Sequence, residues 1–220
     1  MIENTIKFSS KENVKHLRNV YFVIYPDDVS TLQAISREFK RTFNPQQKMT
    51  QRPSGNFFGT VSSRATDHVE VQVGPILLQI VTGDITNEQT DVIVNSSNSD
   101  FTLRAGVSKA ILDAAGQTVE DECKALGFQP NNGIITTNPG NLQCKKIIHM
   151  VGQTDPNQMR AFIGAILQKC EDDKFSSVSF PALGTVVACL PAHYFIVACE
   201  VFKNSCYFAC SYESSRNMNK

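Results

Sequence analysis

The chain has 220 residues, enough for one ordinary domain with an additional segment. Its 21 Lys and Arg balance its 21 Asp and Glu, so the net charge indicates neither direct nucleic-acid binding nor attraction to an anionic membrane. Seven cysteines, an odd number, form no C-x-x-C pair, which favours free thiols in a reducing compartment over a disulfide framework or a zinc site. The most apolar window, 186–199, is too short to span a bilayer, and no secretory signal is found at the start. We therefore expect a soluble intracellular protein.

The first segment, residues 1–43, predicts one strand and one helix. Residues 19–25 are a β-branched and aromatic run of strand length that ends at Pro26. Apolar residues then recur at helical spacing from Val29 to about Phe43. One strand and one helix cannot bury enough apolar surface to be stable alone.

The rest of the chain predicts a linker, an α/β unit and a tail. Residues 44–67 break any hydrophobic period, so we expect a linker there. Residues 68–185 alternate apolar strands with helices, which predicts a three-layer α/β fold with a mixed sheet and helices on both faces. The expected strands are 69–73, 76–81, 92–95, 133–137, 146–151 and 177–180, and the expected helices are 106–115, 118–126 and 156–172.

Polar residues follow three of these strands. Asp84, Asn95 and Gly184 come at or just after predicted strand ends. Ligands of open α/β sheets bind beyond the carboxyl ends of the strands, so these positions predict a pocket. A carboxylate and an amide above an apolar sheet suit an adenine and a ribose.

Four motifs carry a family resemblance. They are Gly-Asp-Ile-Thr at 83–86, Val-Asn-Ser-Ser-Asn at 94–98, Leu-Arg-Ala-Gly-Val-Ser-Lys-Ala-Ile at 103–111 and Phe-Pro-Ala-Leu-Gly-Thr at 180–185. Each is weak alone, but together, in this order and at these distances, the chain resembles a macrodomain, the ADP-ribose-binding module. It is most similar to the tandem macrodomains of the mono-ADP-ribosyltransferase family. The resemblance implies Asp84 and Ile85 for the adenine, Asn95 for the distal ribose, Gly106 and Val107 for one side of the diphosphate, and Leu183, Gly184 and Thr185 for the other.

From the residues alone, other roles remain open. Asp84 could cap a turn or helix, Asn95 could satisfy buried backbone, and 104–107 could be an ordinary loop. Ser108 stands where hydrolysing members of the family often carry an acidic residue, and a serine without a neighbouring His or Lys is a poor general base. His149, inside an apolar strand, is expected to be a satisfied core residue.

We therefore expect no catalytic residue, no metal and no cofactor, with ADP-ribose as a ligand only. NAD chemistry belongs to a C-terminal transferase domain of full-length relatives, which nothing in this sequence resembles.

The resemblance stops after Thr185. The family continues there with a helix, a strand and a final helix, whereas residues 186–220 predict a divergent, poorly ordered tail, as an alternative terminal exon or a frame change would produce. The fold is thus expected to lack its C-terminal strand and helix. Losing the burial of four large side chains costs about 6–12 kcal/mol, comparable with the total stability of a domain.

Residues 19–43 suggest a second possibility. They resemble the last strand and helix of a preceding macrodomain, in which Phe22 or Tyr25 would be the aromatic residue that stacks on adenine. They are either a remnant of that domain or, in a permuted arrangement, they fill the vacancy in the next one.

The expected function is recognition of free or protein-linked ADP-ribose in the nucleus or cytoplasm, in signalling or transcription regulation. The expected partners are ADP-ribose and mono-ADP-ribosylated proteins, without a membrane and without direct nucleic-acid contact. The alternatives are a non-binding interaction fragment, an unstable splice product and an ADP-ribosyl hydrolase.

Overall fold

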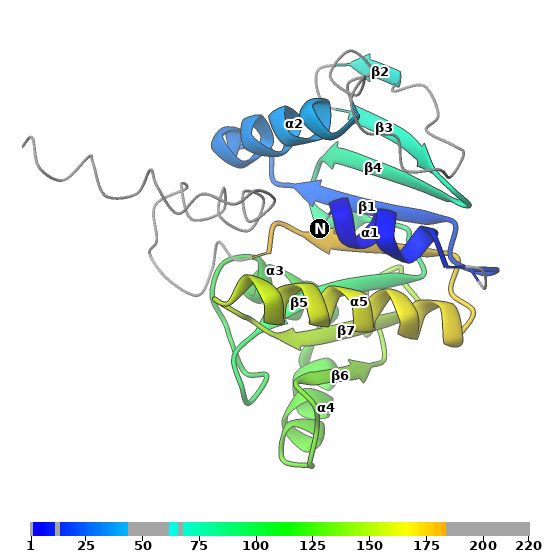
Figure 1. The fold of residues 1–220 in the computed structure, drawn as a ribbon. Coiled ribbons are helices and arrows are strands. Elements are labelled where there is room, and N and C mark those ends of the chain that lie inside the picture. Colours follow the sequence, from blue (N-terminus) through cyan, green and yellow to red (C-terminus); the bar gives the residue numbers. More distant parts are fainter. Residues whose placement is uncertain (1, 12–13, 44–61, 66–67, 184–220) are drawn as a thin grey trace, which may run out of the picture.

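A computed structural model describes residues 2–11, 14–43, 62–65 and 68–183, which form one eight-stranded sheet between helices (Figure 1). The strands are β1 (Asn19–Ile24), β2 (Ser62–Ala65), β3 (His68–Val73), β4 (Ile76–Thr82), β5 (Val92–Ser97), β6 (Ile134–Thr137), β7 (Lys146–Val151) and β8 (Ser177–Pro181). The helices are α1 (Ile2–Ser9), α2 (Val29–Phe43), α3 (Gly106–Ala115), α4 (Gln117–Gly127), α5 (Pro156–Asp172) and the short 3₁₀ helix η2 (Ile85–Asn87). None of the described helices is long and apolar enough to cross a membrane.

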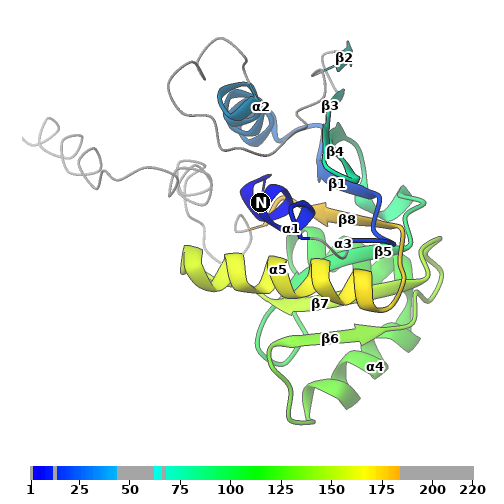
Figure 2. The same ribbon diagram turned by 45° about the vertical axis from the view of Figure 1, so that its right-hand side comes forward.

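The sheet is mixed and covered on both faces, as expected. Its strand order is β2-β3-β4-β1-β8-β5-β7-β6, parallel from β4 to β7 and antiparallel towards each edge. Helices α1, α2 and α5 lie on one side of it (Figure 2), where Phe8, Phe39 and Ile166 are buried in one core cluster. A second cluster on the other face contains Ile111 of α3 and Val119 of α4. Nearly continuous apolar strands are what burial on both faces requires.

Strand β1 lies in the middle of this sheet. It pairs in parallel with β4, with Ile24 opposite Thr82, and with β8, with Phe22 opposite Phe180. Ile24 is fully buried, and the Phe22 ring lies 5.8 Å from that of Phe180. β1 is thus a central strand of the sheet formed with residues 68–183, and α2 packs on the core next to it. This pairing is the one expected if residues 19–43 join the following unit instead of remaining a separate remnant.

Three observed elements were not predicted: the short η2, helix α1 and strand β2. Helix α1 has only eight residues, and a helix that short is unstable in water without tertiary contacts. It forms against α5, where the side-chain amide of Asn4 donates to the carbonyl of Arg160 at 2.8 Å. Strand β2 lies within the segment predicted as a linker and pairs irregularly with β3. The other predicted elements begin and end within one or two residues of the observed ones.

Glu171, at the end of α5, fastens the chain just before β1. Its carboxylate accepts hydrogen bonds from the backbone N–H groups of Lys15 at 2.6 Å, His16 at 2.9 Å and Leu17 at 2.8 Å. Burial alone would raise the pKa of this carboxyl, but the three N–H groups outweigh burial and hold the pKa below its usual range. The charge of Glu171 therefore holds the start of β1 on α5.

Candidate ligand-binding site

The carboxyl ends of β4 and β1 lie side by side. The N–H of Gly83 donates to the carbonyl of Ile24 at 2.9 Å, which places Tyr25 beside Gly83 and next to Asp84. Tyr21 and Val23 of β1 belong to the core on the α3 face, and the alternation of a strand places Tyr25 on that same face. Tyr25 is 56% exposed, whereas Tyr21 is partly buried and Val23 is buried. The end of β1 thus adds an accessible aromatic ring to the predicted site.

Asp84 is exposed and caps η2. Its Oδ1 accepts hydrogen bonds from the backbone N–H of Thr86 at 2.9 Å and from the Thr86 hydroxyl at 2.8 Å. The capping role that the sequence left open is therefore present, and both hydrogen bonds use the same carboxylate oxygen. Ile85 buries its side chain but begins η2, so its N–H has no partner within that helix. The other carboxylate oxygen of Asp84 and the N–H of Ile85 are therefore not used in the hydrogen bonds of η2.

Asn95 lies inside the molecule instead of at its surface. It is fully buried, and its Nδ2 lies 3.1 Å from Nδ1 of His149, while its Oδ1 is buried without a hydrogen-bond partner. The network assigns the donors: Nδ2 of Asn95 donates to His149, whose Nε2 donates to the Thr137 hydroxyl at 2.9 Å. Burial lowers the pKa of His149 to about 4, so the imidazole is neutral. The prediction that His149 is a satisfied core residue is confirmed, and Asn95 is its partner.

Asn98, the last residue of the Val-Asn-Ser-Ser-Asn motif, is a second amide near the end of β5. It follows directly after β5, is exposed, and accepts a hydrogen bond from the N–H of Thr102 at 2.8 Å through its Oδ1. β5 continues two residues beyond Asn95, so Asn98 and not Asn95 comes after the strand end. An extension of the strand pattern through Ser97 would have pointed to it.

The start of α3 presents backbone N–H groups next to η2, which it contacts. Gly106 has φ +52°, a left-handed conformation that glycine adopts without strain. The residue that caps the helix, Ala105, has no side chain able to occupy the first N–H groups, so an anion could bind there with the helix dipole. Val107, the next residue of α3, is half-buried and packs against the core cluster on the α3 face of the sheet. The assignment of Gly106 and Val107 to the diphosphate stays a prediction.

Two further side chains of this loop are engaged elsewhere. The guanidinium of Arg104 forms ion pairs with Asp113 and Glu120, on the surface between α3 and α4. The hydroxyl of Ser108 is buried and donates to the carbonyl of Leu103 at 2.8 Å. Because these two side chains have other partners, an anion at the start of α3 would be bound by backbone N–H groups.

The predicted second phosphate loop is described only at its first residue. Leu183 buries its side chain in the core on the α5 face, away from a ligand. Gly184 and Thr185, together with the predicted tail 186–220, lie outside the described residues. Within the described residues, no group of three or more His, Cys, Asp or Glu could hold a metal ion.

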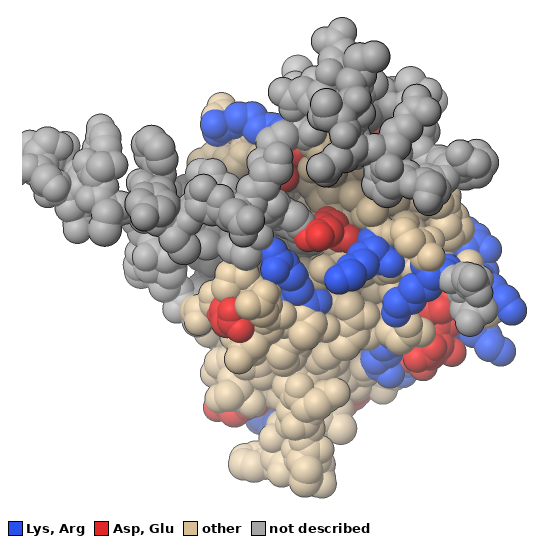
Figure 3. Space-filling view, in the orientation of Figure 1, with Lys and Arg blue, Asp and Glu red and all other residues tan. Residues whose placement is uncertain are grey.

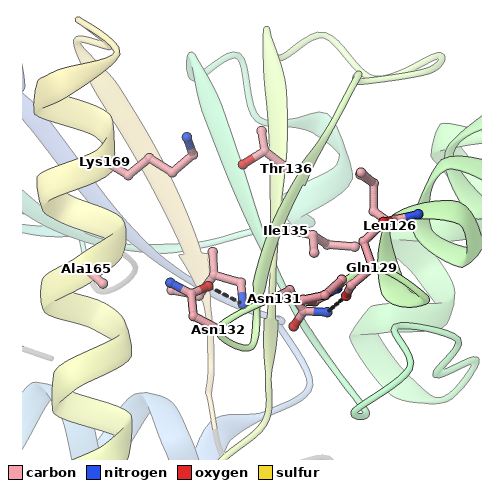
Figure 4. Close-up of a pocket in the computed structure, with 10 residues that line it drawn as sticks. Leu126, Gln129, Asn131, Asn132, Ile135, Thr136, Ala165 and Lys169 are labelled. Atoms are coloured by element: carbon pink, nitrogen blue, oxygen red, sulfur yellow. Dashed lines mark hydrogen bonds between the residues drawn. The ribbon is translucent and has the colours of Figure 1, made fainter.

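A separate hollow flanks the edge strand β6 (Figure 4). It has a volume of about 450 Å³ and is lined by Leu126, Asn132 and Thr136 on one side and by Ala165 and Lys169 of α5 on the other. β6 is five strand spacings from β4, or roughly 24 Å, so this hollow is not part of the site at Asp84. On the face in Figure 3, basic and acidic side chains are interspersed, without a field of one sign.

Comparisons with known proteins agree with this geometry. The Macro domain family matches residues 94–198. A macro domain-containing protein of Listeria monocytogenes is 32% identical, over 52% of this chain and 71% of its own length. The chain belongs to the macrodomain family. The human protein mono-ADP-ribosyltransferase PARP14 is 44% identical over 84% of this chain, which spans 10% of that protein's length.

Solved macrodomains from Oceanobacillus iheyensis superpose on this one. The structure with ADP is 28% identical with a TM-score of 0.52, over 64% of this chain and 80% of its own. A variant with ADPR is 29% identical with a TM-score of 0.53, over 60% and 80%. The three-layer macrodomain fold is thereby confirmed for this chain.

Proposed function

We propose that this macrodomain binds ADP-ribose, free or attached to proteins. The observation that carries the proposal is the grouping of Asp84, Ile85 and Tyr25 at adjacent strand ends, next to the open N-terminus of α3. A carboxylate oxygen and an N–H group match the edge of an adenine, and an exposed aromatic ring matches its face. The first turn of α3 suits a diphosphate.

The assignment of individual residues follows this geometry. Asp84 accepts a hydrogen bond from the adenine amine, Tyr25 stacks on the base, and Gly106 and Val107 hold the diphosphate. The exposed amide of Asn98 is the better candidate for the distal ribose because Asn95 is turned into the core. Leu183, Gly184 and Thr185 keep their predicted role on the far side of the phosphates through backbone groups.

The comparisons support this proposal through the ligands named for the Oceanobacillus proteins, ADP and ADPR. The likeness to PARP14 supports a role connected with mono-ADP-ribosylation. We propose modified proteins as the partners and the nucleus or cytoplasm as the place of action. We propose in the same way that the chain acts in transcription or signalling regulation as a reader of the modification. The described residues of this chain offer groups that can bind ADP-ribose, which is what a reader requires.

The test is the affinity of the purified chain for ADP-ribose by isothermal titration calorimetry. Asp84→Ala removes a hydrogen bond to a charged group, worth about 1.5–3 kcal/mol, so affinity should fall about 10- to 150-fold. Asp121→Ala is the matched control, because Asp121 lies on α4 and contacts Gln117 and Lys124. A loss below threefold for Asp84→Ala would remove Asp84 from the site. Absence of binding by the unaltered chain would refute the function.

A hydrolytic activity is the second candidate, favoured by one relative. A protein of Salmonella newport named O-acetyl-ADP-ribose deacetylase is 33% identical over 50% of this chain and 68% of its own length. Hydrolysis needs a group that activates water, and the Ser108 hydroxyl is buried and donates to Leu103. Release of acetate from O-acetyl-ADP-ribose, or of ADP-ribose from a modified protein, detected by mass spectrometry, would favour the hydrolase over the reader.

A further inference from the structure

The N-terminal segment, here residues 2–43 with α1, β1 and α2, is a separate piece of the fold. Among the described strands, β1 is the one that joins β4 to β8, so it links a half-sheet of β2, β3 and β4 to a half-sheet of β8, β5, β7 and β6. The chain runs from this segment to the rest through residues 44–61. The segment therefore docks between two halves of one sheet, to which it is attached in sequence at one end.

The segment is held at three places. At its start, the carboxylate of Glu171 accepts the N–H groups of residues 15–17, and the Lys11 ammonium donates to Gln168 at 2.8 Å. In its middle, β1 forms ladders on both sides and buries Phe22 and Ile24. At its end, the carbonyl of Ile24 accepts from Gly83, the residue before Asp84.

The third place is also the ligand site. Tyr25 belongs to the docked segment, whereas Asp84, Ile85 and Gly106 belong to the rest of the chain. Withdrawal of β1 would remove the aromatic ring and would also release Gly83, which positions Asp84. The complete site exists in the docked state.

We propose that the N-terminal segment is a docking element that completes the ligand site, so that ADP-ribose binding and docking of this segment strengthen each other. A ligand that binds the docked state in preference to the undocked state must stabilise docking by mass action. The inference rests on the proposed function, since it concerns the same ligand. It assigns Glu171, at the far end of β1, as a positioning residue for the site.

The experiment uses the full chain with a protease cleavage sequence placed within residues 44–61. After cleavage the two pieces remain associated through the contacts of β1, and their dissociation constant is measured with and without ADP-ribose. At an ADP-ribose concentration 100 times its dissociation constant, the pieces should associate up to about 100-fold more tightly. A change below threefold, in protein whose uncut form binds ADP-ribose, would overturn the inference and leave the proposed function intact. Absence of binding by the uncut form would refute both.

Three variants separate positioning from general stability. Tyr25→Ala should reduce the tightening by ADP-ribose while leaving association without ligand within about twofold. Glu171→Gln should weaken association tenfold or more both with and without ligand. Glu122→Gln is its matched control, because Glu122 accepts the N–H and the amide of Asn138, far from the segment. Equal effects of Glu171→Gln and Glu122→Gln would contradict the role of Glu171.

Hydrogen exchange of the uncut chain gives an independent measurement if the cut pieces do not refold. ADP-ribose should slow the exchange of β1 amides more than that of β7 amides, because β7 belongs to the body that carries the motifs. Equal slowing in both strands would overturn the inference.

Discussion

The N-terminal segment and the body at 68–183 contribute to one sheet in different ways. The body carries the sequence motifs of the family, whereas the segment carries the strand that joins the two halves of the body's sheet. In the proposed ligand site, the body supplies a carboxylate and N–H groups, and the segment supplies an aromatic ring. The motifs therefore mark the polar residues of the proposed site. The strand that joins the two halves of the sheet, and the aromatic ring at its end, come from a segment outside those motifs.

The contrast between segment and body requires that β1 is firmly packed in the sheet of the body. Phe22 is 2% exposed and packs against Phe180 of β8. Phe22→Ala should therefore lower the free energy of unfolding by about 3–5 kcal/mol, measured by urea denaturation. Phe128→Ala is the control, because Phe128 is 90% exposed and its removal should change stability by no more than about 0.5 kcal/mol. Similar values for the two variants would mean that β1 lies outside the core.

A smaller effect is expected where the segment begins. Glu171→Gln replaces charge-assisted hydrogen bonds with weaker ones and should cost about 1–3 kcal/mol at neutral pH. Because the folded state lowers the pKa of Glu171, its contribution is fully present above the ordinary value of 4.5 and is lost as pH falls through the lower folded pKa.

Urea denaturation of the unaltered chain and of Glu171→Gln between pH 7 and pH 3 checks this sign. The gap between their unfolding free energies should stay constant down to about pH 5 and then close. A gap that widens in acid would contradict the assignment of Glu171 as a charged clamp on the segment.

The smallest effect on stability is expected at the end of β1, where the effect on binding should be large. Tyr25→Ala should change the free energy of unfolding by no more than about 0.5 kcal/mol because the ring is more than half exposed. Loss of stacking on a base costs about 1–3 kcal/mol, so affinity for ADP-ribose should fall about 5- to 150-fold in calorimetry. Phe128→Ala, an exposed aromatic remote from the site, should leave affinity unchanged. Unchanged affinity for Tyr25→Ala would exclude the segment from the site.

Much of the body could be predicted from the sequence because its signals are local. Strands such as Lys146–Val151 are continuous apolar runs, and Pro156–Asp172 begins with an N-cap aspartate followed by proline. Helix α1 could not be predicted this way, since it depends on α5, more than 140 residues later in the chain. The sequence left two possibilities for residues 19–43, because hydrophobic periodicity predicts a strand but does not reveal its neighbours in the sheet.

The site shows the same division. Asp84 and Gly106 were proposed from a strand end, a helix start and the family resemblance, and the structure brings the elements that carry them into contact. Asn95 was placed at the strand end because a strand pattern does not show where the strand stops; β5 has two more residues, and the amide that follows it is that of Asn98. Tyr25 was recognised as an aromatic of the right kind, but its neighbours come from tertiary pairing.

The pairing of β1 with β8 also has a consequence during synthesis. Asn19 pairs with Ser177, so β1 leaves the ribosome well before its partner β8 and has to wait for it. At about 5–20 residues per second, that wait is roughly 8–30 s. Throughout it the apolar side chains of β1 lack their final partners, and long-range strand pairing of this kind folds slowly. A nascent chain of this protein should therefore be a substrate for chaperones that bind extended apolar segments, and its yield on expression should depend on them.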